Sequence, residues 1–224
     1  MLVRSYKQPL TLIGGGEFSP QIFSKCLGIA PKLIAVDAGI KYLDIKKVLP
    51  EWIIGDLDSA INLGLWIKKG SNIKKIEEQE TTDFQKCLYS FNAPFFLANA
   101  FLGERIDHSL AAISTIVKMK NKKVILFGKR DILFHIENSI ELNLKKGTRL
   151  SLFPIRKVVG INSEGLKYNI RNIKFSPDKI IGTSNEVSSA KILIELDGPG
   201  MIIILPIICF NDVINKFTQN FVKK

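Results

Sequence analysis

Cysteine and histidine are scarce in this sequence, which limits the redox and metal chemistry it supports. The three cysteines, Cys26, Cys87 and Cys209, are scattered and form no Cys-x-x-Cys pair. An odd number of unclustered cysteines argues against a disulfide framework or a zinc site and fits a reducing compartment. The only two histidines are His108 and His135, too few for a metal site built from histidine ligands.

Long hydrophobic runs are also lacking. The most apolar segment, MIIILPIICF at residues 201–210, contains Pro206 and is far shorter than the roughly 20 residues that span a bilayer. It predicts a buried strand. The apolar run before the glycines in MLVRSYKQPLTLIGGG is too short for a signal peptide. We therefore expect a soluble, cytoplasmic protein with no membrane partner.

Two common nucleotide-binding motifs are absent. The sequence has no GxxxxGK[ST], so no P-loop lysine holds a phosphate, and no GxGxxG, so a dinucleotide fold is not expected. The net charge of +11 nevertheless favours an anionic partner, either a nucleic acid or a phosphorylated small molecule. Basic residues are spread along the chain, and most of the 14 phenylalanines lie in core-like runs. Because a non-catalytic RNA-binding protein needs clustered Lys and Arg with exposed aromatics, we do not expect a nucleic-acid partner.

The first part of the chain alternates between strand-like and helix-like segments. Its apolar strand-like runs are LTLI, KLIAV, EWIIG, IKKI, FFLANAF and KKVILF. The clearest helix is RIDHSLAAISTIVKMK, which places Ile106, Leu110, Ile113 and Val117 on one face. This alternation predicts an α/β domain over residues 1–133, with a mostly parallel sheet covered by helices on both faces.

The pattern changes after about residue 130. Short β-like runs follow one another between Gly, Pro, Asn and Ser residues: DILFHIE, SIELNL, TRLSLFPI, KYNI, AKILIEL and GMIIILP. Such spacing predicts an all-β sandwich over residues 134–224. We place the boundary between residues 129 and 140. The final segment, residues 210–224, is either a short amphipathic helix or a frayed end.

The unusual polar residues of the first domain follow its predicted strands. They are the glycine triplet 14–16, Asp37, Asp56, Asp58, Asp83, Arg105 and Asp107. Each has a structural explanation: glycines permit tight turns, and an aspartate after a strand commonly caps a turn or helix. Arg105 and Asp107 are explained equally well as a surface ion pair. His108 either touches a substrate or is structural.

Taken together, these residues indicate a ligand site, because ligands of open parallel sheets bind beyond the carboxyl ends of the strands. Asp56 and Asp58 are two residues apart, so in an extended chain both carboxylates point to the same side. If Asp37 and Asp83 reach the same edge, four carboxylates crowd one crevice and require a cation. Oxygen ligands of this kind favour Mg²⁺ together with substrate phosphates, and Lys86 and Arg105 are candidates to hold those phosphates.

The stretch ETTDFQK shows how Asp83 is placed. Thr82 and Gln85 occupy the N-cap and N3 positions of a capping box, and Asp83 lies in the first turn between them. A carboxylate there also favours the helix dipole. We interpret Asp83 as a metal ligand that the capping box positions.

Six segments, in this order and spacing, resemble the thiamin pyrophosphokinase family: AVDAGIKYL, IIGDLDS, TTDFQKCL, LGERIDHSLAAI, SEGLKYNI and TSNEV. The resemblance extends from about residue 10 to about residue 206. It implies an α/β catalytic domain, a β-sandwich that binds thiamin, and a homodimer with active sites shared between subunits. The implied reaction transfers pyrophosphate from the co-substrate ATP to thiamin with Mg²⁺, giving thiamin diphosphate and AMP.

The resemblance also assigns roles to individual residues. Asp37, Asp56, Asp58 and Asp83 resemble the metal ligands, and Asp56, Asp58 and Asp83 the catalytic residues. The nucleotide-side residues correspond to Gly15, Asp37, Gln79, Lys86, Arg105 and Asp107. Ser184 and Asn185 resemble the thiamin-binding residues, although the sequence around them alone predicts a turn.

The chain departs from the family pattern in three places. Ala38 and Glu104 each stand where the family usually has a glycine, and both add a side chain near the expected nucleotide. The segment GMIIILP lacks the aromatic ring that some members stack on thiamin. A diphosphokinase of another hydroxymethyl heterocycle, such as a pterin, would keep the acidic residues and change the second domain. GLKYNI and TSNE favour thiamin.

Overall fold

The computed structural model describes residues 2–46, 48–58, 63–103 and 105–222. The chain divides into two compact units. Unit 1 comprises residues 1–115 with 121–129, and unit 2 comprises residues 116–120 with 130–224. Glu104, one of the departures from the family pattern, lies outside the described residues.

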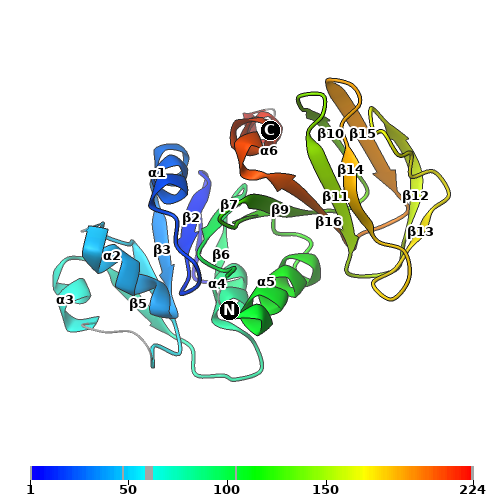
Figure 1. Cartoon of the computed structure of the whole chain (residues 1–224). Helices are drawn as coiled ribbons and strands as arrows, with labels where there is room; N and C mark the ends of the chain where they lie inside the picture. The colour runs from blue at the N-terminus through cyan, green and yellow to red at the C-terminus, as the bar shows by residue number, and fades with distance from the viewer. Residues whose placement is uncertain (1, 47, 59–62, 104, 223–224) are drawn as a thin grey trace. The chain divides into compact units, whose positions relative to one another are not determined.

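Unit 1 contains a parallel sheet in the order β8-β7-β2-β3-β4-β5 (Figure 1). Its strands are β2 (Leu10–Ile13), β3 (Leu33–Val36), β4 (Trp52–Gly55), β5 (Asn72–Lys75), β7 (Phe96–Asn99) and β8 (Val124–Phe127). Every residue of β2, β3, β7 and β8 is buried, as expected for a parallel sheet covered on both sides. The chain runs outward from β2 to β5 and then returns to β7 on the other side of β2. This reversal makes the carboxyl end of β2 a topological switch point, where open α/β sheets bind ligands.

Helices connect these strands. They are α1 (Pro20–Ile29), the 3-10 turn η1 (Asp37–Gly39), α2 (Ile40–Lys46), α3 (Leu63–Lys68), α4 (Asp83–Ser90) and α5 (Ile106–Lys118). A two-stranded parallel pair, β1 (Arg4–Ser5) with β6 (Phe91–Asn92), joins the N-terminal segment to the end of α4. Apolar side chains of α4, including Phe84, Cys87 and Leu88, are buried. None of the helices in the described part of the chain combines the length and apolar character needed to cross a membrane.

Unit 2 is built from two antiparallel sheets. One has the order β14-β11-β16-β9, and the other has the order β10-β15-β12-β13. The strands are β9 (Asp131–Ile136), β10 (Ser139–Asn143), β11 (Arg149–Pro154), β12 (Val158–Glu164), β13 (Lys174–Phe175), β14 (Gly182–Glu186), β15 (Lys191–Leu196) and β16 (Met201–Pro206). The 3-10 turn η2 (Ile207–Cys209) then leads into α6 (Phe210–Val222). The predicted fold class, an α/β domain followed by an all-β domain, is confirmed.

Two local expectations are wrong. The run KYNI is not a strand: residues 167–170 form a bend in which the Tyr168 backbone bonds to the Asn185 side chain. Conversely, the local sequence predicted a turn for TSNE, but these residues lie in strand β14, where Asn185 and Glu186 pair with β11. The predicted helix is observed as α5, and on its apolar face Ile106 is 75% exposed and Leu110 is 62% exposed.

Candidate active site

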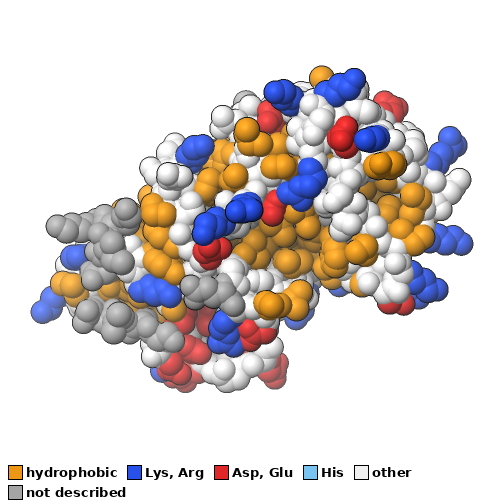
Figure 2. Space-filling view, in the orientation of Figure 1, with side chains coloured by type: hydrophobic (Ala, Val, Ile, Leu, Met, Phe, Trp, Pro, Cys, Tyr) orange, Lys and Arg blue, Asp and Glu red, His pale blue; other side chains and the backbone are white. Residues whose placement is uncertain are grey.

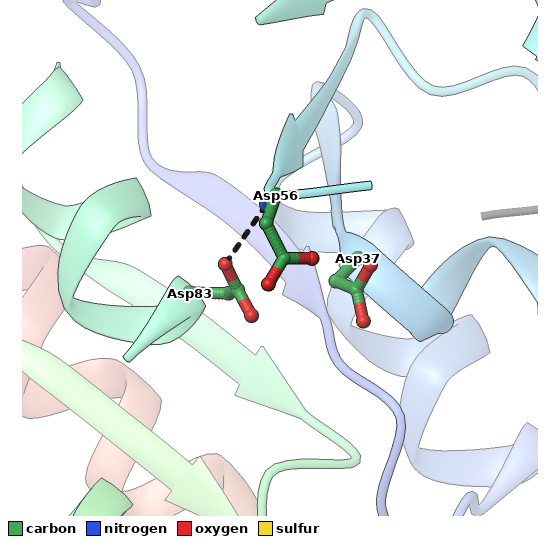
Figure 3. A group of neighbouring side chains, drawn as sticks. All are labelled: Asp37, Asp56 and Asp83. Carbon is green, nitrogen blue, oxygen red and sulfur yellow. Dashed lines mark hydrogen bonds between the residues drawn. The ribbon is translucent and has the colours of Figure 1, made fainter. Parts of the chain in front are cut away.

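Three carboxylates meet at the carboxyl edge of the parallel sheet in unit 1 (Figure 3). Asp37 follows β3, Asp56 follows β4, and Asp83 begins α4. Each offers a carboxylate oxygen, and these oxygens lie within 4.8 Å of one another. Because β3 and β4 are adjacent and parallel, their carboxyl ends bring the first two side chains together. The predicted clustering of these three residues is therefore observed.

Hydrogen bonds fix the direction of Asp83. Its Oδ1 accepts the backbone amide of Asp56 at 3.2 Å and the Lys86 ammonium at 3.2 Å. Thr82 is the N-cap, and its hydroxyl accepts the Gln85 amide at 3.3 Å, so the predicted capping role of Thr82 is confirmed. The Lys86 side chain is only 2% exposed. Lys86 is therefore a buried cation that forms an ion pair with Asp83.

Asp58 does not join the group of three. Leu57 adopts φ +65°, so the extended backbone from which we expected both carboxylates to point to the same side is not observed. Leu57 is buried and Asp58 is exposed, while the Asp58 amide donates to Asp56 Oδ1 at 3.2 Å. In this position Asp58 stabilises the turn that presents Asp56. A catalytic or metal-binding role for Asp58 stays a prediction.

Left-handed backbone recurs at the strand ends that border the site. Asp37 has φ +43°, Leu57 has φ +65° and Ala100, directly after β7, has φ +59°. Such conformations are unfavourable for residues other than glycine and cluster at functional sites. Gly55 has φ +152°, and a Cβ there would lie 3.0 Å from Asp37 Cβ and 3.2 Å from Asp83 Oδ1. The left-handed side of the φ range and these close contacts with Asp37 and Asp83 both favour glycine at this position.

The carboxylates open into a cavity of about 570 Å³ in unit 1. It is lined by residues that follow β2, β3, β4 and β7 and by residues of α4 and α5. The predicted site residues among them are Gly15, Asp37, Asp56, Gln79, Asp83, Lys86 and Arg105, and His108 also lines the wall. Asp58 and Asp107 are not among the lining residues. A cavity of this size accommodates a small-molecule ligand.

The glycine triplet forms one wall of the cavity. Gly14 N donates to Asn99 O at 2.9 Å and Gly16 N donates to Ala100 O at 2.6 Å, which ties the loop to the end of β7. A Cβ on Gly15 would lie 2.9 Å from the Ala38 methyl group. The close approach of two backbone segments explains why this loop is made of glycine.

Arg105 and Asp107 form the ion pair that their spacing suggested. Arg105 donates to Asp107 through Nε at 3.2 Å and through Nη2 at 2.6 Å. Both side chains are exposed. The hydrogen bond from Arg105 lowers the pKa of Asp107. Arg105 lines the cavity. Asp107 does not line it and pairs with the Arg105 guanidinium.

Ser184 and Asn185 belong to β14 in unit 2. Ser184 is exposed and adopts φ +60°, and its amide donates to Ser151 Oγ at 3.1 Å. Asn185 is 7% exposed. Its Oδ1 accepts the amides of Tyr168 at 3.0 Å and Glu186 at 2.8 Å, and its Nδ2 donates to Tyr168 O at 2.7 Å. Asn185 thus ties the bend at Tyr168 to β14, while Ser184 remains open to a ligand.

Sequence reasoning missed several cavity residues. Lys41 lines the cavity and donates from Nζ to Gly15 O at 3.1 Å, and its neighbour Tyr42 donates to Gly16 O at 2.5 Å. Phe84 and Phe101 also line the cavity and pack together, with ring centroids 4.2 Å apart. The position of Lys41 four residues after Asp37, one helical turn on, is the signal that would have found it. The two phenylalanines carry no such signal, because their sequence context is that of core residues.

The fold and the site define a two-unit enzyme whose α/β unit carries a carboxylate-lined cavity at a switch point. Comparison with known proteins identifies the family. Residues 23–127 match the model of the thiamin pyrophosphokinase catalytic domain, and residues 137–200 match the model of the thiamin pyrophosphokinase vitamin B1 binding domain. The chain belongs to the thiamin pyrophosphokinase family, whose members are diphosphotransferases.

Individual relatives agree with this assignment. The chain is 26% identical to thiamin pyrophosphokinase 1 of Caenorhabditis elegans over 181 residues, covering 72% of this chain and 74% of that protein. It is 28% identical to thiamine pyrophosphokinase 2 of Oryza sativa, covering 68% of this chain and 64% of that protein. Thiamin pyrophosphokinase from Candida albicans shares the fold with a TM-score of 0.76 at 17% identity, covering 89% of this chain and 88% of that one.

Proposed function

We propose that this protein transfers a pyrophosphoryl group from ATP to the hydroxyl of thiamin, giving thiamin diphosphate and AMP. The observation that carries the proposal is the meeting of Asp37, Asp56 and Asp83 in the cavity of the unit that matches the catalytic domain. Unit 2 supplies the segment that matches the vitamin B1 binding domain. Together these support ATP as the ligand of the first unit and thiamin as the ligand of the second.

The residues fit a bound Mg²⁺. Their three carboxylate oxygens lie within 4.8 Å of one another, and carboxylate oxygens are the hard ligands that Mg²⁺ prefers in proteins. Asp37, Asp56 and Asp83 would hold the ion. When bound, it would neutralise charge on the phosphates of ATP. The binding of Mg²⁺ by these residues is part of the proposal.

The chain's own residues position the reactants. The thiamin hydroxyl oxygen forms a bond to the β-phosphorus of ATP, the bond from that phosphorus to the α–β bridging oxygen breaks, and AMP leaves with that oxygen. Such transfers depend mainly on orientation and charge neutralisation. Arg105 and Lys41 bring positive charge to the cavity wall. Of the described residues that line the cavity, only Asp37, Asp56 and Asp83 carry a carboxylate to receive the hydroxyl proton.

The alternatives receive less support. On the face shown in Figure 2, Lys and Arg side chains are dispersed among hydrophobic and acidic ones, whereas an RNA-binding surface needs them gathered. The match of residues 137–200 to a vitamin B1 binding domain favours thiamin over another hydroxymethyl heterocycle. We also propose that the protein is a cytoplasmic homodimer whose active sites are shared between subunits, as the family resemblance implies.

Mass spectrometry of the products formed from ATP, Mg²⁺ and thiamin tests the proposed reaction. We expect thiamin diphosphate and AMP in equal amounts. Thiamin monophosphate with ADP would show phosphoryl rather than pyrophosphoryl transfer. Turnover of a hydroxymethylpterin in place of thiamin would show that the substrate is wrong.

A further inference from the structure

The loop between β5 and α4, residues 76–82, forms part of the cavity wall. Gln79, Thr81 and Thr82 line the cavity, and Asp83 follows directly. The loop makes no strand or helix of its own. A backbone hydrogen bond from Ile76 N to Gly55 O at 2.8 Å holds its start, and side-chain hydrogen bonds hold the turn that follows.

Glu78 provides those hydrogen bonds. Its Oε2 accepts the backbone amides of Glu80 at 2.8 Å and Thr81 at 3.0 Å. Its Oε1 accepts the Thr81 hydroxyl and, at 3.2 Å, the Tyr89 hydroxyl. One carboxylate thus closes the turn of the loop and ties it to Tyr89 on α4, the helix that carries Asp83 and Lys86.

We infer that Glu78 is a positioning residue of the nucleotide site: it holds the 79–82 loop in its binding conformation without being a lining residue of the cavity. This inference rests on the proposed function, because it takes Mg²⁺–ATP as the ligand of the cavity. A loop that is ordered before binding loses less conformational entropy when the ligand arrives. The hydrogen bond from the Thr81 hydroxyl also lowers the pKa of Glu78, so the carboxylate stays ionised to a lower pH than that of an isolated glutamate.

The chemistry of the four donors makes a sharp pair of variants. In Glu78→Gln the amide oxygen still accepts the two backbone N–H groups, and the NH₂ group faces two hydroxyls, which can turn and accept. The glutamine variant therefore keeps the network without the charge. Glu78→Ala removes the network entirely. Glu77→Ala is the matched control, because Glu77 is adjacent and exposed and its side chain pairs with Lys75 at 2.9 Å.

The experiment measures the dissociation constant of Mg²⁺–ATP by calorimetry for each variant, without thiamin, at a temperature where all are folded. Removing the network should weaken binding on the order of tenfold in Glu78→Ala. Glu78→Gln and Glu77→Ala should stay within about threefold of the unmodified protein. In steady-state assays, KM for ATP should rise in Glu78→Ala while KM for thiamin stays unchanged.

Three outcomes would overturn the inference. The first is binding of Mg²⁺–ATP by Glu78→Ala as tight as that by Glu77→Ala. The second is a loss of binding in Glu78→Gln as large as in Glu78→Ala, which would make charge the determinant. The third is a lower melting temperature of Glu78→Ala with unchanged binding, which would make the role structural. If the unmodified protein binds Mg²⁺–ATP but does not convert thiamin, the proposed function fails while these binding results still decide the role of Glu78. If it does not bind Mg²⁺–ATP, both are wrong.

Discussion

Lys86 Nζ lies 3.2 Å from Asp83 Oδ1, and the lysine side chain is almost fully buried. A buried ammonium depends on its partner for a counter-charge. Asp83 therefore differs from Asp56. Among the hydrogen bonds and ion pairs of the described residues, Asp56 pairs with no buried cation, and its Oδ1 accepts the Asp58 amide. The two carboxylates lie in the same site, but Asp83 also supplies the counter-charge of a buried lysine.

Replacing each of these two aspartates by asparagine should have opposite effects on the metal-free protein. Asp83→Asn leaves the Lys86 charge buried without a partner, so the free energy of unfolding should fall on the order of 2–4 kcal/mol. Asp56→Asn removes one of three mutually repelling carboxylates, so stability should be unchanged or higher. Urea unfolding in the presence of a chelator measures both. Both variants should lose turnover, and Asp212→Asn, on α6, should keep it. Equal destabilisation of the two, or activity in either, would contradict the assignment.

The contact between Gly15 and Ala38 predicts a compensating pair of substitutions. In Gly15→Ala the new methyl group would lie 2.9 Å from the Ala38 Cβ, and overpacking of this kind costs about 1–3 kcal/mol. Adding Ala38→Gly removes the obstructing methyl group, so the double variant should recover most of the loss. A double-mutant cycle of unfolding free energies measures the coupling. Additive effects of the two substitutions would show that the contact does not control this wall of the cavity.

His135 should make unit 2 sensitive to mild acid. Gly200 N donates to His135 Nε2 at 3.0 Å, and burial, with the nearby charge of Arg156, lowers the pKa of His135 from 6.5 to about 4. Between these values the unfolded chain binds a proton that the folded protein does not. Stability is therefore fully present above pH 6.5 and falls as the pH drops toward 4, by up to about 2 kcal/mol after allowance for partial exposure.

The variant His135→Gln separates this effect from other acid-sensitive groups. Its amide oxygen still accepts the Gly200 amide, and it does not titrate. As the pH falls from 7.5 to 4, the melting temperature of the unmodified protein should drop relative to that of His135→Gln, because only the histidine titrates. Parallel curves would assign the acid sensitivity elsewhere.

The proposed sharing of active sites between subunits predicts complementation. Asp56→Asn damages the catalytic unit and Asn185→Ala damages the unit that matches the B1 binding domain. If each site combines units from two chains, mixed dimers contain one site with both defects and one with neither, so random exchange should restore about a quarter of the unmodified activity. Activity after mixing, with exchange followed by mass labels on the two chains, measures this. A mixture that exchanges and stays inactive would place each site within one chain.

The sequence by itself determined the features of this protein that depend on local chemistry. The buried strands of unit 1 could be predicted from continuous apolar runs, and the start of α4 from the capping pattern around Thr82. The clustering of Asp37, Asp56 and Asp83 followed from one rule, that parallel strands bring their carboxyl ends to the same edge. The family resemblance of the motifs supplied the reaction.

Tertiary structure alone decided the features that depend on backbone conformation and on contacts distant in sequence. Leu57 adopts a left-handed conformation and Asp58 stays outside the group of three carboxylates, and no pattern of residue types shows either. Residues 183–186 became part of strand β14 because β11 lies alongside to pair with them. The burial of Lys86 against Asp83 depends on the packing of α4, and the exposure of Ile106 and Leu110 on what α5 packs against. Hydrophobic periodicity says which faces of an element are apolar; only the assembled chain determines which of them are covered.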